Sequence, residues 1–313
     1  MIQPYVMDEL VTSLQKQAPE MRLEQQAMMS GYTTLRLGGP ADLLAMPSSV
    51  DQLRLLLAEA NRLEVPVTLI GHGSNLVVRD GGIRGLVIRI CRDMRDIQVK
   101  DGVLRAEAGA MLTSLAMAAA EHSLGGLVFA SGIPGTAGGG VYMNAGAYGG
   151  EMSQTVTLVE GLNMDGTSFR YTGEEMRFSH RYSRLMDERK IVTHVTCRLH
   201  PARREDLLAE MVELNRRRAE KQPLNFPSAG STFKRPEGGY ASAMVDQCGL
   251  KGLSVGGAQV SEKHAGFLVN RGGTAADFLA LMAKVQQAVY DRFGVMLEPE
   301  VRILGEDSIA QRV

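Results

Sequence analysis

The sequence predicts an α+β protein with more than one domain. Its 313 residues exceed the length at which a single hydrophobic core usually stops growing. Hydrophobic residues make up 44% of the chain and charged residues 22%, which is the balance of a soluble globular protein. Helical and strand-like segments follow one another in a mixed order, without the regular strand–helix alternation of a doubly wound parallel sheet.

The first half of the chain begins with a helical lead-in, which we expect over residues 1–30. The segment "DQLRLLLAEANRLE" places leucines at helical spacing, with Asp51 as the expected N-cap. Apolar or alternating runs predict three strands, at residues 65–71, 85–90 and 103–110. The alanine-rich run at residues 112–124 has a high intrinsic helix propensity and predicts another helix.

The middle of the chain changes from strands to a helix. Two alternating runs flank Asp165-Gly166, a dipeptide typical of hairpin turns, and a further strand is expected at residues 190–199. The composition changes near Pro201, where we place a domain boundary. The helical pattern that follows it ends at Pro223.

The last third mixes short strands and glycines with one long helix. That helix is expected from Ala275 to Phe293, with Thr274 as its N-cap and Asp277 at the capping-box position. The segment "VMLEPEVRIL" then closes the pattern as an extended run.

Charge and composition argue against several classes of protein. The formal net charge is −1, and the only basic triplet is Arg216 to Arg218, inside a helical pattern where a solvated face is the simplest interpretation. Aromatic residues are only 5% of the chain and tryptophan is absent, so platforms that stack single-stranded bases are not favoured. We therefore expect no nucleic-acid partner.

Cysteine usage and hydropathy point to a cytoplasmic protein. Cys91, Cys197 and Cys248 are widely spaced and form no Cys-x-x-Cys motif, and no histidine stands at ligand spacing from any of them. We therefore expect three reduced thiols and no metal site. The N-terminus lacks the basic start and apolar run of a signal peptide. No uninterrupted apolar run approaches the length of a membrane span.

A first glycine cluster, "LIGHGSNLVVRDGG", follows a predicted strand. Gly71, Gly73, Ser74 and Asn75 form a tight bend whose backbone N–H groups can point to one side and bind a phosphate. The cluster is not the Rossmann fingerprint, because Leu76 stands where that motif needs a glycine. A plain surface turn between two strands is an equally open interpretation of this cluster alone.

A second cluster, "SGIPGTAGGGVYMNAGA", has too many glycines for a turn and too many packable side chains for a linker. Its expected use is the close approach of backbone to a large, flat, buried ligand, with Tyr142, Met143 and Asn144 packed around that ligand. Two such loops suggest a dinucleotide cofactor.

Five motifs, in this order, carry a family resemblance: "GHGSNLVVRDGGIRGLVI", "SGIPGTAGGGVYMNAGAYGGE", "PSAGSTFKRP", "SEKHAGFLVN" and "LEPEVRILG". Together they resemble the bacterial UDP-N-acetylenolpyruvoylglucosamine reductases, over residues 32–305. The resemblance implies an FAD-binding domain of the vanillyl-alcohol-oxidase (PCMH) type and a smaller C-terminal α+β substrate-binding domain, as in the shorter subtype. The domain ranges that we expect are 1–30 for the lead-in, 31–201 for the FAD-binding domain with a subdomain boundary near 92, 202–306 for the substrate domain, and 307–313 for a tail.

The resemblance also implies the reaction. NADPH reduces FAD, and the reduced flavin delivers hydride to the enolpyruvyl methylene carbon of UDP-N-acetylglucosamine enolpyruvate. The product is UDP-N-acetylmuramate for peptidoglycan synthesis. A cytoplasmic enzyme without membrane insertion is expected, as a monomer. Residues matched to the cofactor loops are expected to bind FAD: Gly71, Gly73, Ser74, Asn75, Leu76, Gly109, Gly132, Pro134, Gly135, Thr136, Gly138 and Gly139.

Three residues match the catalytic positions of the family. Hydride addition builds negative charge on the carboxylate side, and Arg181 is the matched bidentate donor. Ser231 matches the serine that protonates the intermediate, and Glu300 matches the glutamate that polarises the enol together with the arginine. Glu298 would share a strand face with Glu300, so the choice between them rests on the motif. His180 stands where relatives usually carry tyrosine.

Substrate contacts are expected at Lys234, for the diphosphate, and at Arg235 and Gln259. Many relatives have asparagine at the position of Arg235, and the lysine expected near Ala243 is missing. Two rival functions share part of the pattern. A flavin-dependent oxidase of hydroxy acids would share the glycine loops without the catalytic set, and a nucleotide-binding module would bind the cofactor without turnover.

Overall fold

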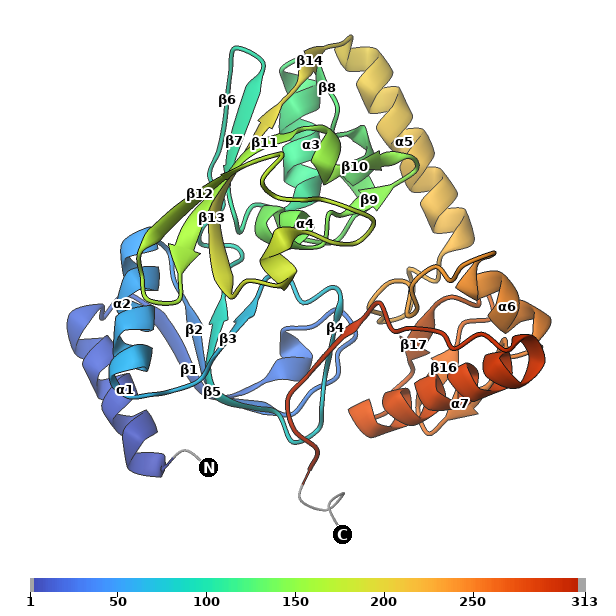
Figure 1. Cartoon of the computed structure of the whole chain (residues 1–313), viewed down its shortest axis with the longest axis horizontal. Coiled ribbons are helices and arrows are strands. Elements are labelled where there is room, and N and C mark those ends of the chain that lie inside the picture. The colour runs from blue at the N-terminus through green and yellow to red at the C-terminus, as the bar shows by residue number, and fades with distance from the viewer. Residues whose placement is uncertain (1–2, 309–313) are drawn as a thin grey trace. The chain divides into compact units, whose positions relative to one another are not determined.

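The computed structural model describes residues 3–308, which form two compact units that are each discontinuous in sequence (Figure 1). Among the described residues, unit 1 contains 3–24, 43–72 and 85–218, and unit 2 contains 25–42, 73–84 and 219–308. Each unit has its own hydrophobic core. The largest fully buried side chain of unit 2 is Phe278, and leucines such as Leu53 and Leu86 fill unit 1.

An antiparallel five-stranded sheet forms the centre of unit 1, in the order β12-β11-β13-β7-β6. Its strands are β6 (Ile97–Lys100), β7 (Val103–Glu107), β11 (Val156–Asn163), β12 (Ser168–Thr172) and β13 (Lys190–Arg198). The helices α3 (Leu112–Glu121) and α4 (Ala137–Tyr142) pack against it, as Figure 1 shows. All neighbouring strands run antiparallel, so the α+β prediction is confirmed here.

The predicted hairpin between β11 and β12 is present. Asp165 accepts a hydrogen bond from the Thr167 N–H at 2.9 Å, and Gly166 adopts φ +84°, a conformation that glycine takes at little cost.

A second, four-stranded sheet has the order β1-β2-β5-β3. Its strands are β1 (Arg22–Met28), β2 (Pro40–Met46), β3 (Val67–Ile70) and β5 (Ile83–Arg89). The helices α1 (Pro4–Gln17) and α2 (Val50–Arg62) pack against each other.

Two sequence expectations fail in this region. The helical lead-in expected over residues 1–30 is wrong beyond Gln17, because Arg22–Met28 form a strand in which only Ala27 is buried. Asp51 is not the N-cap of α2. Ser49 takes that position and accepts a hydrogen bond from the Gln52 N–H at 3.2 Å, so the N-cap lies two residues earlier than expected.

Unit 2 contains a three-stranded antiparallel sheet covered by a long helix. The strands are β15 (Ser254–Val255), β16 (Ala258–Val260) and β17 (Leu268–Asn270), and the helices are α6 (Ala241–Gln247) and α7 (Ala275–Phe293). The predicted capping box of α7 is confirmed, since Thr274 accepts from the Asp277 N–H at 3.1 Å and Asp277 accepts from the Thr274 N–H at 3.0 Å. Gly294 ends α7 at φ +68°.

The remaining elements are short, except for the helix α5. They are η1 (Met29–Gly31), β4 (Leu76–Val78), β8 (Leu124–Gly125), η2 (Val128–Gly132), β9 (Gly146–Ala147), β10 (Gly150–Glu151), η3 (Met152–Gln154), η4 (Arg184–Met186), β14 (His200–Pro201), α5 (Arg204–Lys221) and β18 (Arg302–Leu304). In unit 2, β4 and β18 pair in parallel.

The three cysteines are free thiols, as predicted. Cys197 is fully buried, and burial raises the pKa of its thiol to about 11, so it is a packing residue rather than a nucleophile. Within residues 3–308, no helix is long and apolar enough to cross a membrane.

Candidate functional site

The two glycine clusters meet in unit 1, where Gly71 lies against Thr136. A Cβ atom at Gly71 would stand 2.7 Å from the Thr136 Oγ1, so only glycine fits without moving that hydroxyl. Thr136 is the N-cap of α4, and its hydroxyl accepts a hydrogen bond from the Gly139 N–H at 3.3 Å. Predicted cofactor residues from both clusters are therefore brought together.

Backbone hydrogen bonds fix the second cluster to the segment that follows β7. The Ala137 N–H donates to the Ala110 carbonyl at 2.7 Å, and the Gly138 N–H donates to the Ala108 carbonyl at 2.9 Å. Gly135 accepts at 2.8 Å from the N–H that begins α3. Pro134 and Gly139 remain exposed beside these buried contacts. The loop is thus held by backbone hydrogen bonds and keeps two of its residues exposed.

Part of the glycine content serves packing within the protein. A Cβ atom at Gly109 would lie 2.1 Å from the Cys91 carbonyl oxygen, and one at Gly132 would lie 2.6 Å from the Asn215 Oδ1 on α5. The sequence interpretation that glycines make room for a ligand therefore needs a correction, because at these two positions the approaching atoms belong to the chain itself. The binding role of both residues stays a prediction.

Two buried polar atoms beside these loops have no hydrogen-bond partner within the described chain. They are the His72 Nδ1, next to Gly71, and the Ser131 Oγ, next to Gly132. Buried polar atoms are rarely left without a partner, and a bound polar ligand is one way to satisfy them. The glycine contact at Thr136 and these two atoms fit a nucleotide cofactor at the loops of unit 1. Burial, followed by two neighbouring arginines, lowers the pKa of His72, so its ring is neutral at pH 7.

The end of the first cluster lies in unit 2, beside the predicted catalytic glutamate. The side-chain amide of Asn75 donates to the Glu300 backbone carbonyl at 3.2 Å, and the backbone carbonyl of Asn75 accepts from the Arg302 N–H at 2.9 Å. Leu76 begins β4 and pairs with Arg302. Gly73 adopts φ +77°, with its backbone against the Tyr32 carbonyl. Ser74, half-buried, stands between Gly73 and Asn75.

Ser231 and Glu300 lie on two paired segments of unit 2. The Glu300 N–H donates to the Thr232 carbonyl at 2.8 Å, and the Lys234 N–H donates to the Glu298 carbonyl at 2.8 Å. Ser231 directly precedes Thr232 and is exposed, whereas Glu300 is half-buried. The fold therefore brings together the backbone segments that carry the predicted acid and the predicted enol-polarising glutamate, although the two are far apart in sequence.

The two glutamates in this segment differ in exposure. The Glu298 carboxylate is exposed and forms an ion pair with the Lys234 Nζ at 3.0 Å. Glu300 is the less exposed of the two. The choice of Glu300 over Glu298 as the site residue stays a prediction that rests on the motif. Lys234, the predicted diphosphate contact, forms its ion pair with Glu298.

The other two predicted substrate contacts point to different places. The Arg235 Nε donates to the Gly239 carbonyl at 3.2 Å, and its guanidinium lies 4.1 Å from the centre of the Tyr240 ring. Gln259 on β16 accepts from the Arg271 Nη1 at 2.9 Å and lines a separate cavity. Lys234 is not among the residues that line this cavity, so the structure does not bring these two predicted substrate contacts together there.

Arg181 in unit 1 is presented by a strained turn at φ +54°, and its Nη2 donates to the Gly146 carbonyl at 3.0 Å. Asn144 fixes this turn: its amide donates to the Ser179 carbonyl at 2.9 Å and accepts from the Ser153 N–H at 2.9 Å. The side chain of Asn144 is fully buried. The expectation that Asn144 packs around a ligand is wrong, because both ends of its amide bind the protein.

The carboxylate of Glu151 lies near Arg181 and interacts with its charge. A hydrogen bond from Ser153 holds the pKa of Glu151 below its ordinary value, and the charges of His180 and Arg181 lower it further. Glu151 is therefore ionised at neutral pH and helps to balance the positive charge of the turn.

Comparison with known proteins supports both halves of the sequence interpretation. A model described as "FAD binding domain" matches residues 41–172, and one described as "UDP-N-acetylenolpyruvoylglucosamine reductase, C-terminal domain" matches residues 222–304. The chain is 47% identical over 290 residues to the UDP-N-acetylenolpyruvoylglucosamine reductase of Pediococcus pentosaceus, covering 92% of this chain and 96% of that protein. It is 48% identical over 281 residues to the enzyme of the same name from Latilactobacillus sakei, covering 90% and 92%.

A solved structure shows the same fold. The crystal structure of UDP-N-acetylenolpyruvylglucosamine reductase from Thermus caldophilus superimposes with a TM-score of 0.79 at 36% identity, and the match covers 91% of this chain and all of that one (100%).

Proposed function

The chain belongs to the UDP-N-acetylenolpyruvoylglucosamine reductase family, and from this premise we propose that Arg181, Ser231 and Glu300 carry its reaction. The chain is an FAD- and NADPH-dependent oxidoreductase of peptidoglycan synthesis, which converts UDP-N-acetylglucosamine enolpyruvate to UDP-N-acetylmuramate. The observation that carries the assignment of residues is the pairing of the Ser231 and Glu300 segments beside Asn75 of the glycine cluster. We also propose that it acts in the cytoplasm, as a monomer.

We propose that residues of the glycine loops would hold FAD, namely Gly71, Ser74, Asn75, Thr136 and Gly138. The chemistry that FAD supplies when bound is acceptance of a hydride from NADPH and donation of a hydride to the methylene carbon of the enolpyruvyl group. The remaining tasks fall to side chains of this chain.

Those tasks are the stabilisation of negative charge and the delivery of a proton. As the methylene carbon gains a hydride, negative charge develops on the side of the carboxylate. We assign its stabilisation to the Arg181 guanidinium, a fixed fork of donors that fits a carboxylate. Ser231 then transfers its hydroxyl proton to the carbon that bears the carboxylate, which completes the saturated lactyl ether. Glu300 polarises the enol beside it.

The exposure of Ser231 supports its role as the acid, because its hydroxyl lies on a surface that a substrate can reach. Ser228, three residues earlier, provides a matched control. Its carbonyl accepts a hydrogen bond from Thr34, and its segment pairs with Val269, which is a structural role.

The test separates the two halves of the reaction in a stopped-flow spectrometer. In Ser231→Ala, NADPH should reduce the flavin at the wild-type rate, and reoxidation by the UDP-sugar should fall by at least about a hundredfold, the scale of a lost general acid. Ser228→Ala should keep both rates. Wild-type reoxidation in Ser231→Ala would remove Ser231 from the mechanism.

A further inference from the structure

Thr34 connects two segments of unit 2 that are distant in sequence and that both carry predicted functional residues. Its backbone N–H donates to the Gly73 carbonyl of the first glycine cluster at 3.1 Å. Its side-chain hydroxyl donates to the Ser228 carbonyl at 2.7 Å. Ser228 precedes the predicted acid Ser231 by three residues. One half-buried residue therefore joins a predicted cofactor loop to the segment that carries the predicted proton donor.

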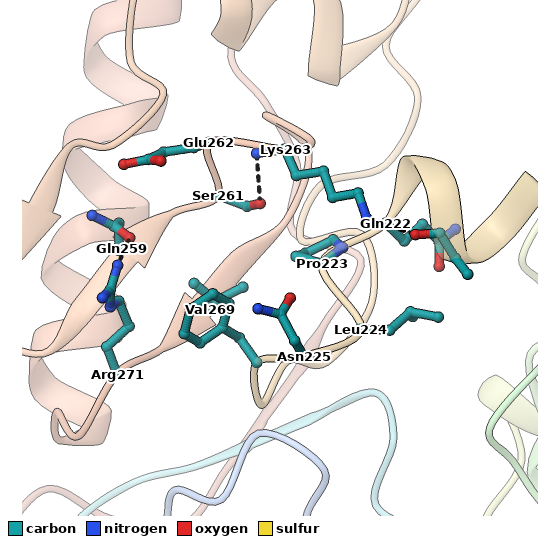
Figure 2. Close-up of a pocket in the computed structure, with 12 residues that line it drawn as sticks. Gln222, Pro223, Leu224, Asn225, Gln259, Ser261, Glu262, Lys263, Val269 and Arg271 are labelled. Atoms are coloured by element: carbon teal, nitrogen blue, oxygen red, sulfur yellow. Dashed lines mark hydrogen bonds between the residues drawn. The ribbon is translucent and has the colours of Figure 1, made fainter.

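The chain that leads to Ser228 is only partly supported by packing. Leu224 is exposed, and residues 222–226 line a cavity of about 470 Å³. Figure 2 shows Leu224 on one side of this cavity and Arg271 on the other. The Arg271 guanidinium lies 5.0 Å from the centre of the Phe226 ring. Because a cavity borders this stretch, the hydrogen bonds near Ser228 decide where the residues that follow it lie.

On the other side of Ser231, the buried Thr232 is fixed through its backbone and its side chain. Its N–H donates to the Gly266 carbonyl at 2.9 Å, and its carbonyl accepts from the Glu300 N–H at 2.8 Å. Its hydroxyl accepts from the Leu268 N–H at 3.2 Å. The chain is therefore held in place directly after Ser231.

The residues just before Ser231 are held less tightly. Gly230 adopts φ +80°, and nothing lies within 4 Å of a Cβ atom placed there, so this residue does not fix the chain by packing. Ser228 forms a β-bridge to Val269, and its carbonyl accepts from the Thr34 hydroxyl. Loss of that hydroxyl would let this end of the segment move while the end at Thr232 stays in place.

We propose that Thr34 is a positioning residue that holds the Ser231 hydroxyl in register with the cofactor loop, an inference that rests on the proposed function. The hydride and the proton enter at adjacent carbons of the enolpyruvyl group, so the proton donor must keep a fixed place relative to the bound cofactor. The contacts of Thr34 to Gly73 and Ser228 supply that register. A misplacement of about 1 Å can cost as much as about a hundredfold in rate.

Thr34→Val tests the proposal in the FAD-loaded protein, because it removes the hydroxyl, keeps the shape of the side chain and leaves the N–H bond to Gly73 intact. In a stopped-flow spectrometer, flavin reoxidation by the UDP-sugar should slow by about tenfold, since the anchor at Thr232 remains. Flavin reduction by NADPH should keep its wild-type rate. The solvent deuterium isotope effect on reoxidation should rise, because transfer of the Ser231 proton becomes more rate-limiting. Thr34→Ser, which keeps the hydroxyl, should restore most of the rate.

Thr33 provides a matched control in the same segment. Its hydroxyl donates to the Leu37 carbonyl at 3.0 Å, a local bond that leads to neither Gly73 nor Ser228. Thr33→Val removes a hydrogen bond of the same kind, and because Thr33 is buried, the free energy of unfolding should fall at least as much as in Thr34→Val. Its flavin reoxidation should nevertheless keep the wild-type rate.

A double variant shows whether Thr34 acts through Ser231. In the presence of Ser231→Ala, Thr34→Val should slow reoxidation no further, because the hydroxyl that it positions is gone. Three outcomes would overturn the proposal: wild-type reoxidation in Thr34→Val, equal slowing in Thr33→Val, or a full additional loss in the double variant. Failure of the proposed function looks different, since Ser231→Ala alone would then reoxidise its flavin at the wild-type rate.

Discussion

Asn144 connects the stability of unit 1 to the position of Arg181, and its removal should affect both. Asn144→Ala leaves the Ser153 N–H and the Ser179 carbonyl without their partner. An unsatisfied buried group costs about 1–3 kcal/mol, and we take the lower part of that range because Ser179 is exposed and water can replace the lost donor. Asn144 also has φ +42°, where alanine costs about 1 kcal/mol more.

The free energy of unfolding should therefore fall by about 3 kcal/mol in Asn144→Ala, and by about 2 kcal/mol in Asn144→Gly, which has no left-handed strain. The chain has no tryptophan, so urea unfolding is best followed by circular dichroism at the helix signal. Asn61→Ala is the matched control. Asn61 is exposed and donates a single hydrogen bond to a backbone carbonyl, at 2.7 Å, so its loss should cost about 1 kcal/mol or less.

The same variant should slow flavin reoxidation by the sugar nucleotide by about tenfold or more, because a loosened turn misplaces the Arg181 guanidinium. Flavin reduction by NADPH should change little. If Asn144→Ala were no less stable than Asn61→Ala and reoxidised its flavin at the wild-type rate, the assignment of Asn144 as the support of this turn would be refuted.

Two further predictions concern the glycine loops of unit 1. Gly71→Ala should weaken FAD binding by roughly five- to a hundredfold, the equivalent of about 1–3 kcal/mol of overpacking, because the new methyl group would lie 2.7 Å from the Thr136 hydroxyl. Fluorescence titration of FAD would measure this loss. Gly31→Ala is the control and should bind FAD normally, because nothing lies within 4 Å of its added Cβ atom. Because burial lowers the pKa of His72, the unfolded chain binds a proton on this residue at a higher pH than the folded chain does, and the free energy of unfolding should fall as the pH drops below about 6.5. In urea unfolding between pH 7.5 and 5.5, a His72→Gln variant should lose less of this free energy than the wild type. An identical pH dependence in the two proteins would contradict the account.

Local signals in the sequence predicted much of the secondary structure. The capping box at Thr274 and the hairpin at Gly166 depend on residues within a few positions of each other, so both could be read directly. The strand Arg22–Met28 was missed because only Ala27 is buried, and a mostly exposed strand leaves no alternating apolar pattern. Ser49 was missed because Asp51, two residues later, is an equally good N-cap by residue type.

Long-range pairings account for what the sequence could not show. The motifs identified Ser231 and Glu300, but their adjacency depends on the hydrogen bond between Glu300 and Thr232, which joins distant segments. Likewise, Phe226 and Arg271 meet only because their segments line one cavity, and neither belongs to a recognisable spacing pattern. The division into two discontinuous units has the same origin, since it reflects contacts rather than composition.

The most direct test of the central claim is an anaerobic absorbance titration of the purified wild-type protein. We predict a yellow protein that loses its flavin absorbance on addition of NADPH and regains it only when UDP-N-acetylglucosamine enolpyruvate is added. A protein that is bleached by NADPH but does not respond to the sugar nucleotide would contradict the assignment of substrate and of the residues Arg181, Ser231 and Glu300.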